Sequence, residues 1–278
     1  MKIKKHFIPG MLIVALFLFV IVMSCEKEDD EPTPPVENGD NGNDNDDNDN
    51  NGNNGEDFAC GGEFTDTRDG TVYSTVQIGD QCWMAENLRY LPSVVGPGAS
   101  AVLTNYYYVY EYYGTSVTDA KTSINYNAYG VLYNWSAAMN ACPEGWYLPN
   151  NVEWTKLVDY VVAQGYPNEG GNPDGAGNAL KSCRQVDSPL GGECDTSEHP
   201  RWNSCNIHYG ADVFGFTALP GGNVFGSFES IGNCCYFWSA TEYDTYIAWV
   251  ILCSCIGNVN KTNLYKKYGF SVRCIKGN

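Results

Sequence analysis

The sequence contains no apolar stretch as long as the roughly 20 residues that a bilayer-spanning helix requires. Its main apolar run extends only from Met11 to Met23, so we expect no part of the mature chain to cross a membrane. Basic residues are also scarce, with 16 Lys and Arg against 33 Asp and Glu and a formal net charge of -17. This balance argues against nucleic acid and anionic lipid headgroups as partners.

Short catalytic motifs are missing as well. The chain has no G-x-S-x-G, no H-E-x-x-H, no P-loop and no G-x-G-x-x-G, which removes the usual signatures of serine hydrolases, zinc proteases and nucleotide-binding enzymes. A glycosidase remains compatible with the sequence, because its two carboxylates are defined by their separation in space. We assign no catalytic residue and expect no cofactor.

The N-terminus has the pattern of an export signal. Lysines precede the apolar run, and Ser24 and Cys25 follow it at once. This pattern predicts a signal peptide over residues 1–24. Val22-Met23-Ser24-Cys25 resembles a lipobox, in which the cysteine is acylated and becomes the new N-terminus, so we predict a lipid anchor on Cys25. An ordinary secretory signal with a cysteine nearby is the alternative.

Residues 25–57 predict an acidic, disordered tether. Beyond Glu31 they are almost wholly Asn, Asp, Gly, Pro and Glu, with Val36 as the one aliphatic residue, so burial cannot offset the entropy of ordering. The acidic run Glu26–Glu31 resembles the export signal that sends lipoproteins of Bacteroidetes-type bacteria to the outer face of the outer membrane. A solvated linker start is the other interpretation. We therefore expect an outer-membrane location, facing outside.

Cysteine content predicts a disulfide-rich domain over residues 58–278. The chain has 12 cysteines, of which Cys25 is the predicted anchor, and an exported domain oxidises its thiols by default. The odd number that remains leaves at least one thiol free or bonded to another molecule. Two cysteines and two histidines have spacings that could hold zinc, but their order is wrong for a finger and we assign no metal site: Cys194, His199, Cys205 and His208.

Periodicity gives a coarse secondary structure for this domain. Alternation over 71–78 followed by Trp83-Met84 predicts a hairpin. Helical spacing predicts one helix over 130–141, and the capping box Asn150-Asn151-Val152-Glu153 predicts another that ends near Gly165. The remaining half is strand-like, with segments separated by Gly, Asn and Asp: 214–219, 236–241, 247–253 and 270–275.

Aromatic residues provide the candidate ligand-binding positions. The run 106–113 contains Tyr108, Tyr110 and Tyr112, and as a strand it would place rings on both faces. Such rings can stack on sugars, and Trp202 is a further candidate. The competing interpretation is that one face of this strand packs on the core while the other covers an edge.

Several motifs fall in the order expected for one known family. They include DGTVY with VQIG at 69–79, WMAENL at 83–88, YGVLYNW at 129–135, CPEGWYLP at 142–149, GFTALPGG at 215–222, FWSAT at 237–241 and SVRC at 271–274. Together they resemble the Fibrobacter succinogenes major paralogous domain, across most of residues 60–276. The resemblance provides a domain type without a reaction, because the family's biochemical role is not established.

The resemblance implies an α+β, C-type-lectin-like fold: an N-terminal hairpin, two helices and a mostly antiparallel sheet. It also implies a long-range disulfide between Cys142 and Cys274. Two insertions, at about 92–128 and 165–212, depart from the simple pattern and are expected to be long loops. We therefore predict a surface-exposed, non-catalytic binding or adhesion module for an extracellular glycan or surface protein. An enzyme of unknown class acting on extracellular polymer, or a structural subunit of a surface complex, is the alternative.

Overall fold

Two β-sheets and five helices make up the part of the chain that the computed structural model describes, which is residues 58–182, 202–203, 210–254 and 256–277. The first sheet has the strand order β1-β2-β3-β13-β6. These strands span Glu63–Thr65, Val72–Ile78, Gln81–Met84, Ile275–Lys276 and Trp146–Tyr147. The fold is therefore α+β, as the sequence predicts.

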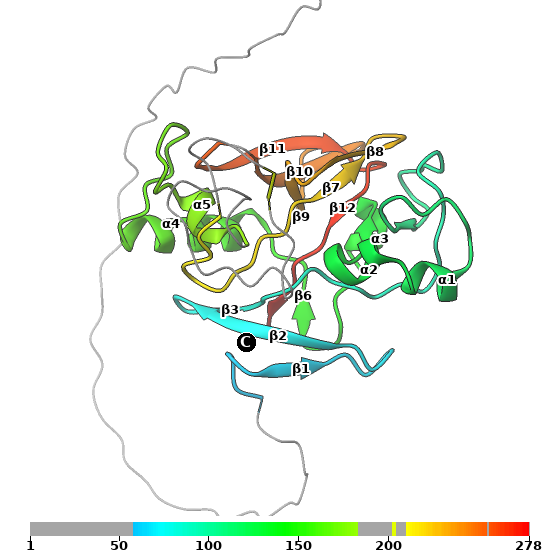
Figure 1. The fold of residues 1–278 in the computed structure, drawn as a ribbon, viewed down its shortest axis with the longest axis horizontal. Helices are drawn as coiled ribbons and strands as arrows, with labels where there is room; N and C mark the ends of the chain where they lie inside the picture. The colour runs from blue at the N-terminus through cyan, green and yellow to red at the C-terminus, as the bar shows by residue number, and fades with distance from the viewer. Residues whose placement is uncertain (1–57, 183–201, 204–209, 255, 278) are drawn as a thin grey trace, which may run out of the picture. The chain divides into compact units, whose positions relative to one another are not determined.

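The second sheet has the order β11-β10-β9-β12-β5-β4, and β7 pairs with both β8 and β9. Most of its pairs are antiparallel, but β7 and β12 each run parallel to β9. Its strands span Tyr107–Tyr108 (β4), Leu132–Tyr133 (β5), Gly221–Val224 (β7), Phe228–Ile231 (β8), Cys235–Glu242 (β9), Ile247–Cys253 (β10), Val259–Tyr265 (β11) and Phe270–Ser271 (β12). Figure 1 shows the two sheets with helices at both sides.

The helices are short except for one. They span Val117–Lys121 (α1), Ile124–Tyr129 (α2), Trp135–Ala138 (α3), Asn151–Ala163 (α4) and Ala176–Leu180 (α5). In α4 the Asn150 side chain accepts from the backbone N–H groups of Val152 and Glu153, and Glu153 accepts from the N–H of Asn150. The predicted capping box is thus present. No helix among the described residues is long and apolar enough to span a bilayer.

The predicted hairpin is β2 and β3, which pair antiparallel around a turn in which Gly79 has φ 62°. Its burial does not follow a single alternation. Tyr73 and Thr75 are buried on one face, whereas Ile78 is buried on the other. The reason is that Tyr73 packs in one hydrophobic core and Ile78 in a second core, so the strand passes between them.

The helix predicted over 130–141 is wrong in its first half. Leu132 and Tyr133 form β5, which pairs with β4 and β12, and helix α3 follows only after Asn134, whose side chain caps it. The apolar residues that gave the helical spacing belong to two different elements, strand β5 and helix α3 with the turn after it. Strand pairing with residues distant in sequence outweighs a short local preference.

Two predicted strands are also wrong or shortened. The tyrosine run pairs only at Tyr107–Tyr108, because Glu111 has φ 61° and the chain turns. Segment 214–219 forms no regular strand; it makes a single bridge from Ala218 to Lys181, and Thr217 has φ 53°.

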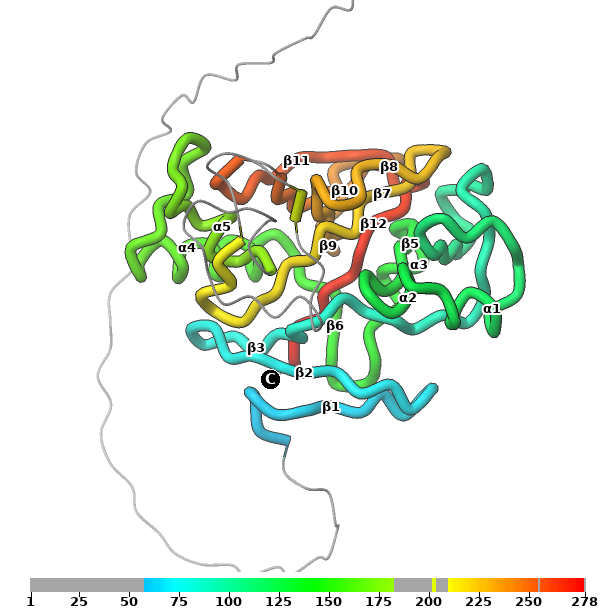
Figure 2. The backbone as a smooth tube through the Cα atoms, viewed as in Figure 1, coloured from blue at the N-terminus to red at the C-terminus, as the bar shows by residue number. Residues whose placement is uncertain are grey.

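The strand predicted over 270–275 is split between the two sheets. Phe270–Ser271 belong to the second sheet and Ile275–Lys276 to the first, and Figure 2 shows this last segment running from one to the other. Arg273 lies at the crossing and is fully buried. Its guanidinium donates to the carbonyl oxygens of Met84, Phe216 and Thr217 and to Oδ1 of Asn87. One side chain therefore ties strand β3 and the loop after it to the segment at 216–217.

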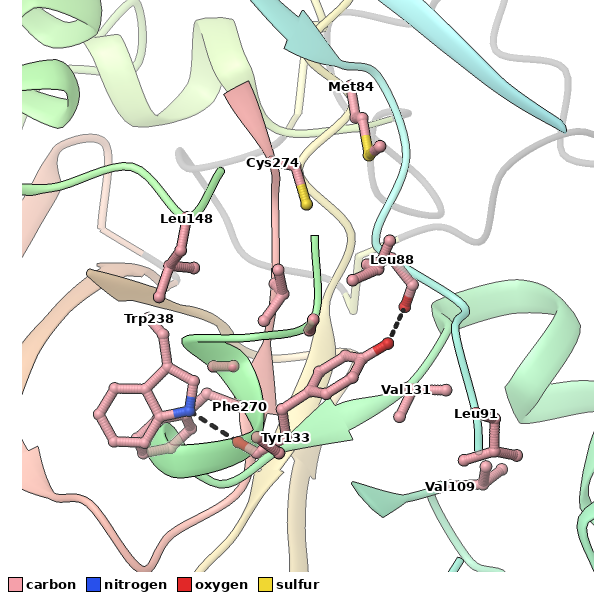
Figure 3. Packing of buried hydrophobic residues seen from close by; sticks show 14 of the residues in the cluster. Met84, Leu88, Leu91, Val109, Val131, Tyr133, Leu148, Trp238, Phe270 and Cys274 are labelled. Atoms are coloured by element: carbon pink, nitrogen blue, oxygen red, sulfur yellow. Dashed lines mark hydrogen bonds between the residues drawn. The ribbon is translucent and has the colours of Figure 1, made fainter. Parts of the chain in front are cut away.

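The larger core forms around Trp238 and Tyr133 (Figure 3). Trp238 donates from Nε1 to the carbonyl oxygen of Tyr133 at 2.7 Å. The Tyr133 hydroxyl lies 2.8 Å from the carbonyl oxygen of Tyr90 and 3.3 Å from that of Leu88, and shares its donor between them. Phe270 packs on the Trp238 ring with centroids 4.6 Å apart. The tryptophans Trp83, Trp146, Trp154 and Trp238 are buried, and Trp135 is partly buried.

The buried tyrosines predict a loss of stability in alkali. Burial raises the pKa of Tyr73, Tyr108 and Tyr133 above the ordinary value of 10.0. Their hydroxyls stay protonated in the folded state while those of the unfolded chain ionise, so stability is complete below about pH 10 and falls as the pH rises towards the folded-state pKa values. Urea unfolding between pH 8 and 11 measures this.

For the Tyr133→Phe variant we expect a shallower alkaline slope, because each proton difference contributes about 1.4 kcal/mol per pH unit. An equally steep slope in this variant would exclude Tyr133 as a source of the effect.

Candidate functional site

The structure joins Cys142 to Cys274, the pair implied by the family resemblance, with Cα atoms 5.9 Å apart. A second disulfide links Cys60 to Cys82 on strand β3. The Cys60–Cys82 bond attaches the segment before β1 to the first sheet, and the Cys142–Cys274 bond attaches the segment before β6 to the crossing between the two sheets. The predicted anchor Cys25 and the four candidate zinc ligands lie outside the described residues.

Three of the four aromatic residues proposed as ligand-binding positions are in the interior. Tyr108, Tyr110 and Trp202 are 0%, 7% and 2% exposed, so their rings cannot present a face to a large ligand. Tyr108 donates its hydroxyl to the carbonyl of Ala99, and Trp202 donates from Nε1 to the carbonyl of Ala218. Tyr112 is partly exposed, and it packs against the larger core.

A pocket of about 220 Å³ lies elsewhere, between helix α4 and the hairpin of β10 and β11. Buried or half-buried apolar residues form its floor, and mostly exposed polar residues form its rim. The floor comprises Trp154, Val158, Ile251 and Val259, and the rim comprises Thr155, Asp159, Asn168, Asn260 and Lys261. We refer to it as the α4–β11 pocket.

The sequence positions these floor and rim residues by simple periodicity. Helix α4 contributes two pairs of residues four positions apart, Trp154 with Val158 and Thr155 with Asp159. This spacing puts all four on one side of the helix. On β10 and β11, Ile251 lies opposite Lys261. Asn168 holds its loop against β11 at the pocket rim. Its side chain accepts from the N–H of Val259 at 2.7 Å and donates to the carbonyl oxygen of the same residue at 3.1 Å.

An aromatic patch formed by Tyr243 and Trp249 adjoins this pocket. Trp249 stands two residues before Ile251 on β10, so both side chains project from the same face of the sheet. The rings of Tyr243 and Trp249 have centroids 5.6 Å apart, and Tyr243 is 57% exposed. Lys261 connects pocket and patch, because it lines the pocket while its Nζ lies 5.5 Å from the centroid of the Trp249 ring.

Trp154 lines the floor of the pocket, but most of its ring packs in the core. Phe237 stacks on its ring at 5.6 Å and Trp83 packs 4.9 Å away, so the core covers much of the ring. Its buried Nε1 has no hydrogen-bond acceptor in the described part of the chain.

Acidic residues are scarce in the described lining of the pocket. Asp159 is the single carboxylate among its described lining residues, whereas glycoside hydrolysis generally requires two carboxylic groups facing one bond. No group of three or more His, Cys, Asp or Glu side chains among the described residues could hold a metal ion. The arrangement offers hydrogen bonds at a rim, an apolar floor and aromatic rings beside it.

Sequence reasoning missed Trp249, Tyr243 and Lys261. A strand over 247–253, as predicted, places Trp249 and Ile251 on one face, but the sequence does not say how far a helix covers that face. Ala248 and Val250 on the opposite face pack in the larger core. Trp249 remains partly exposed because α4 covers only the Ile251 end.

Taken together, these features define a disulfide-tied α+β domain with a pocket of about 220 Å³ at one edge of its larger sheet. The chain belongs to the Fibrobacter succinogenes major domain family, whose model matches residues 76–276. Comparison with curated proteins found no match. Comparison with solved structures found none either.

Proposed function

We propose that this chain is a lipid-anchored surface protein that binds an extracellular glycan in the α4–β11 pocket and on the adjoining aromatic patch. The observation that carries the proposal is the partly exposed Trp249 beside a pocket with a polar rim. Sugar rings combine hydroxyl groups with apolar C–H faces, so a site for them needs both hydrogen-bonding side chains and an exposed ring.

Charge and chemistry support a glycan more than a nucleic acid. The chain has a net charge of -17, and the described lining of the pocket has one acid, Asp159, and one base, Lys261. The other rim residues are neutral amides and a hydroxyl: Thr155, Asn168 and Asn260. Neutral groups of this kind pair with sugar hydroxyls as donors and acceptors alike.

The relation to C-type-lectin-like domains is part of the same proposal. The disulfide from Cys142 to Cys274, the helix α4 and Trp238 in β9 support it. The split of the last strand and the parallel pairs of β9 depart from a simple antiparallel sheet. The resemblance therefore concerns the general arrangement of the central elements.

Binding to a panel of immobilised polysaccharides and surface proteins tests the glycan proposal. We expect the purified full chain to bind at least one polysaccharide, with the Lys261→Ala variant binding more weakly because a rim donor is lost. The Lys267→Ala variant is the control, since this exposed lysine does not line the pocket. Binding only to proteins, or unchanged glycan binding in Lys261→Ala, would contradict the proposed site.

The anchor has its own test in the Cys25→Ser variant. Thioether-linked acylation needs the Cys25 sulfur, and two acyl chains hold a protein on a membrane durably. We expect cells fed labelled palmitate to label the natural chain and to leave Cys25→Ser unlabelled and released from the membrane fraction. Label on the variant would exclude Cys25 as the acylated residue.

A further inference from the structure

Two buried cysteines face each other across neighbouring strands. Cys235 opens β9, Cys253 closes β10, and the antiparallel register places them directly opposite. Their side chains are 1% and 3% exposed and belong to the second hydrophobic core. Both are present as thiols in the structure.

This placement suits a disulfide without movement of the backbone. Directly opposed residues in an antiparallel pair have Cα atoms about 4.5–5.5 Å apart, and disulfides form at Cα separations of about 4.4–6.8 Å. The register between β9 and β10 is regular at this end, because Ile251, Leu252 and Cys253 pair in sequence with Phe237, Tyr236 and Cys235.

The surroundings of the two thiols are unequal. The hydrogen bond from Cys235 lowers the pKa of the Cys253 thiol, and the positive charge of Lys181 acts in the same direction. Burial raises the pKa of Cys235. Lys181 is itself fully buried, and its Nζ donates to Oδ1 of Asn178 at 3.0 Å. A lowered pKa favours the thiolate, which is the nucleophile in disulfide exchange.

We propose that Cys235 and Cys253 form a third disulfide, across β9 and β10, by exchange with a disulfide-bearing thiol oxidant outside the cytoplasm while the domain folds, before the second core covers the two sulfurs. The Cys253 thiolate attacks the oxidant's disulfide and releases one oxidant thiol. The Cys235 thiolate then attacks the Cys253 sulfur of the mixed disulfide and releases the second. Two thiols of the chain are oxidised, one disulfide of the oxidant is reduced to two thiols, and the protons pass to those thiols.

The proposed disulfide would lie next to the strands that form the floor of the α4–β11 pocket. The proposal of the disulfide does not depend on which ligand the pocket binds. Cys253 pairs on its other side with Val259 of β11, and Val259 lines the pocket. Cys235 lies two residues before Phe237, which stacks on Trp154. The disulfide therefore fixes the strands on which the floor is built.

Peptide mapping of the full chain, exported by a bacterial host and alkylated without reduction, tests the proposal. Chymotrypsin separates the two cysteines because it cuts after Tyr236 and Trp249. We expect a linked pair of peptides containing Cys235 and Cys253, with the Cys142–Cys274 and Cys60–Cys82 links as internal controls. Fragment-ion sequencing identifies the bonded sulfurs, since Cys234 and Cys255 lie close by in sequence.

Two variants remove the ambiguity from those neighbours. In Cys234→Ser/Cys255→Ser the link is expected to persist, and adding Cys253→Ala is expected to abolish it and to yield alkylated Cys235. If Cys235 and Cys253 are both alkylated even after the chain is unfolded and refolded with oxidised glutathione, the proposal is wrong. A bond from either of them to any other cysteine overturns it equally, with or without the variants.

Discussion

Arg273→Met is expected to lower the free energy of unfolding by about 3–5 kcal/mol. Arg273 is fully buried, and it donates to Met84, Phe216, Thr217 and Asn87 at the point where the chain passes between the sheets. Burial lowers the pKa of Arg273 to about 10, so the guanidinium is charged at neutral pH. Methionine would leave four acceptors without their donor.

Chemical denaturation at pH 7 measures this change. A thermal melt is the second measurement. A domain of this size loses about 2–4 °C in melting temperature per kcal/mol, so the melting temperature is expected to fall by roughly 6–20 °C. Lys267→Met is the matched control and is expected to change stability by less than about 0.5 kcal/mol, because Lys267 is exposed. Equal stability of the Arg273→Met and Lys267→Met variants would contradict the bridging role of Arg273.

Removal of the Cys142–Cys274 disulfide is expected to have a similarly large effect. The bond closes a separation of 132 residues, and the chain-entropy model assigns such a loop about 4–5 kcal/mol. The double variant Cys142→Ala/Cys274→Ala avoids leaving an unpaired thiol in the core. Its denaturation midpoint is compared with that of the natural chain under non-reducing conditions.

The second disulfide supplies the comparison for this prediction. Cys60 and Cys82 are separated by 22 residues, for which the same model gives about 3–3.5 kcal/mol. The Cys60→Ala/Cys82→Ala variant should therefore be the more stable of the two. The reverse order would show that strain or denatured-state structure, rather than loop length, determines the contribution of each bond.

Local chemistry in the sequence predicted the elements that depend on neighbouring residues. The capping box at Asn150 and Glu153, the hairpin around Gly79, and strands β9 and β10 are all found where their patterns indicated. Each of these signals involves residues close together in the chain. Such local rules hold when tertiary contacts agree with them.

The wrong predictions share one cause, which is that distant contacts decided the outcome. Tyr133 is in a strand because Tyr107 and Phe270 pair with it. Tyr108 and Tyr110 are buried because Val224 and Leu132 pack in the same cluster. A run of tyrosines alone does not indicate which rings a neighbouring segment covers.

The pocket could not be derived from the sequence for the same reason. Its lining combines α4 and Asn168 with two strands that begin much later in the chain, at Ile247 and Val259. The sequence gives the apolar face of β10 through Trp249 and Ile251, but the extent of its cover depends on where α4 lies. Only the folded arrangement separates the buried Ile251 from the partly exposed Trp249.

The most direct test of the proposed glycan site is calorimetric titration of the full chain, in detergent, with a polysaccharide bound in the panel. We expect Trp249→Ala to weaken binding at least tenfold, a loss of about 1.4 kcal/mol or more, with unchanged thermal stability of the domain. Tyr113→Ala is the control, because this 71% exposed ring belongs to the aromatic run at 106–113 and not to the pocket. Full affinity in Trp249→Ala, or an equal loss in Tyr113→Ala, would contradict the assignment of the site.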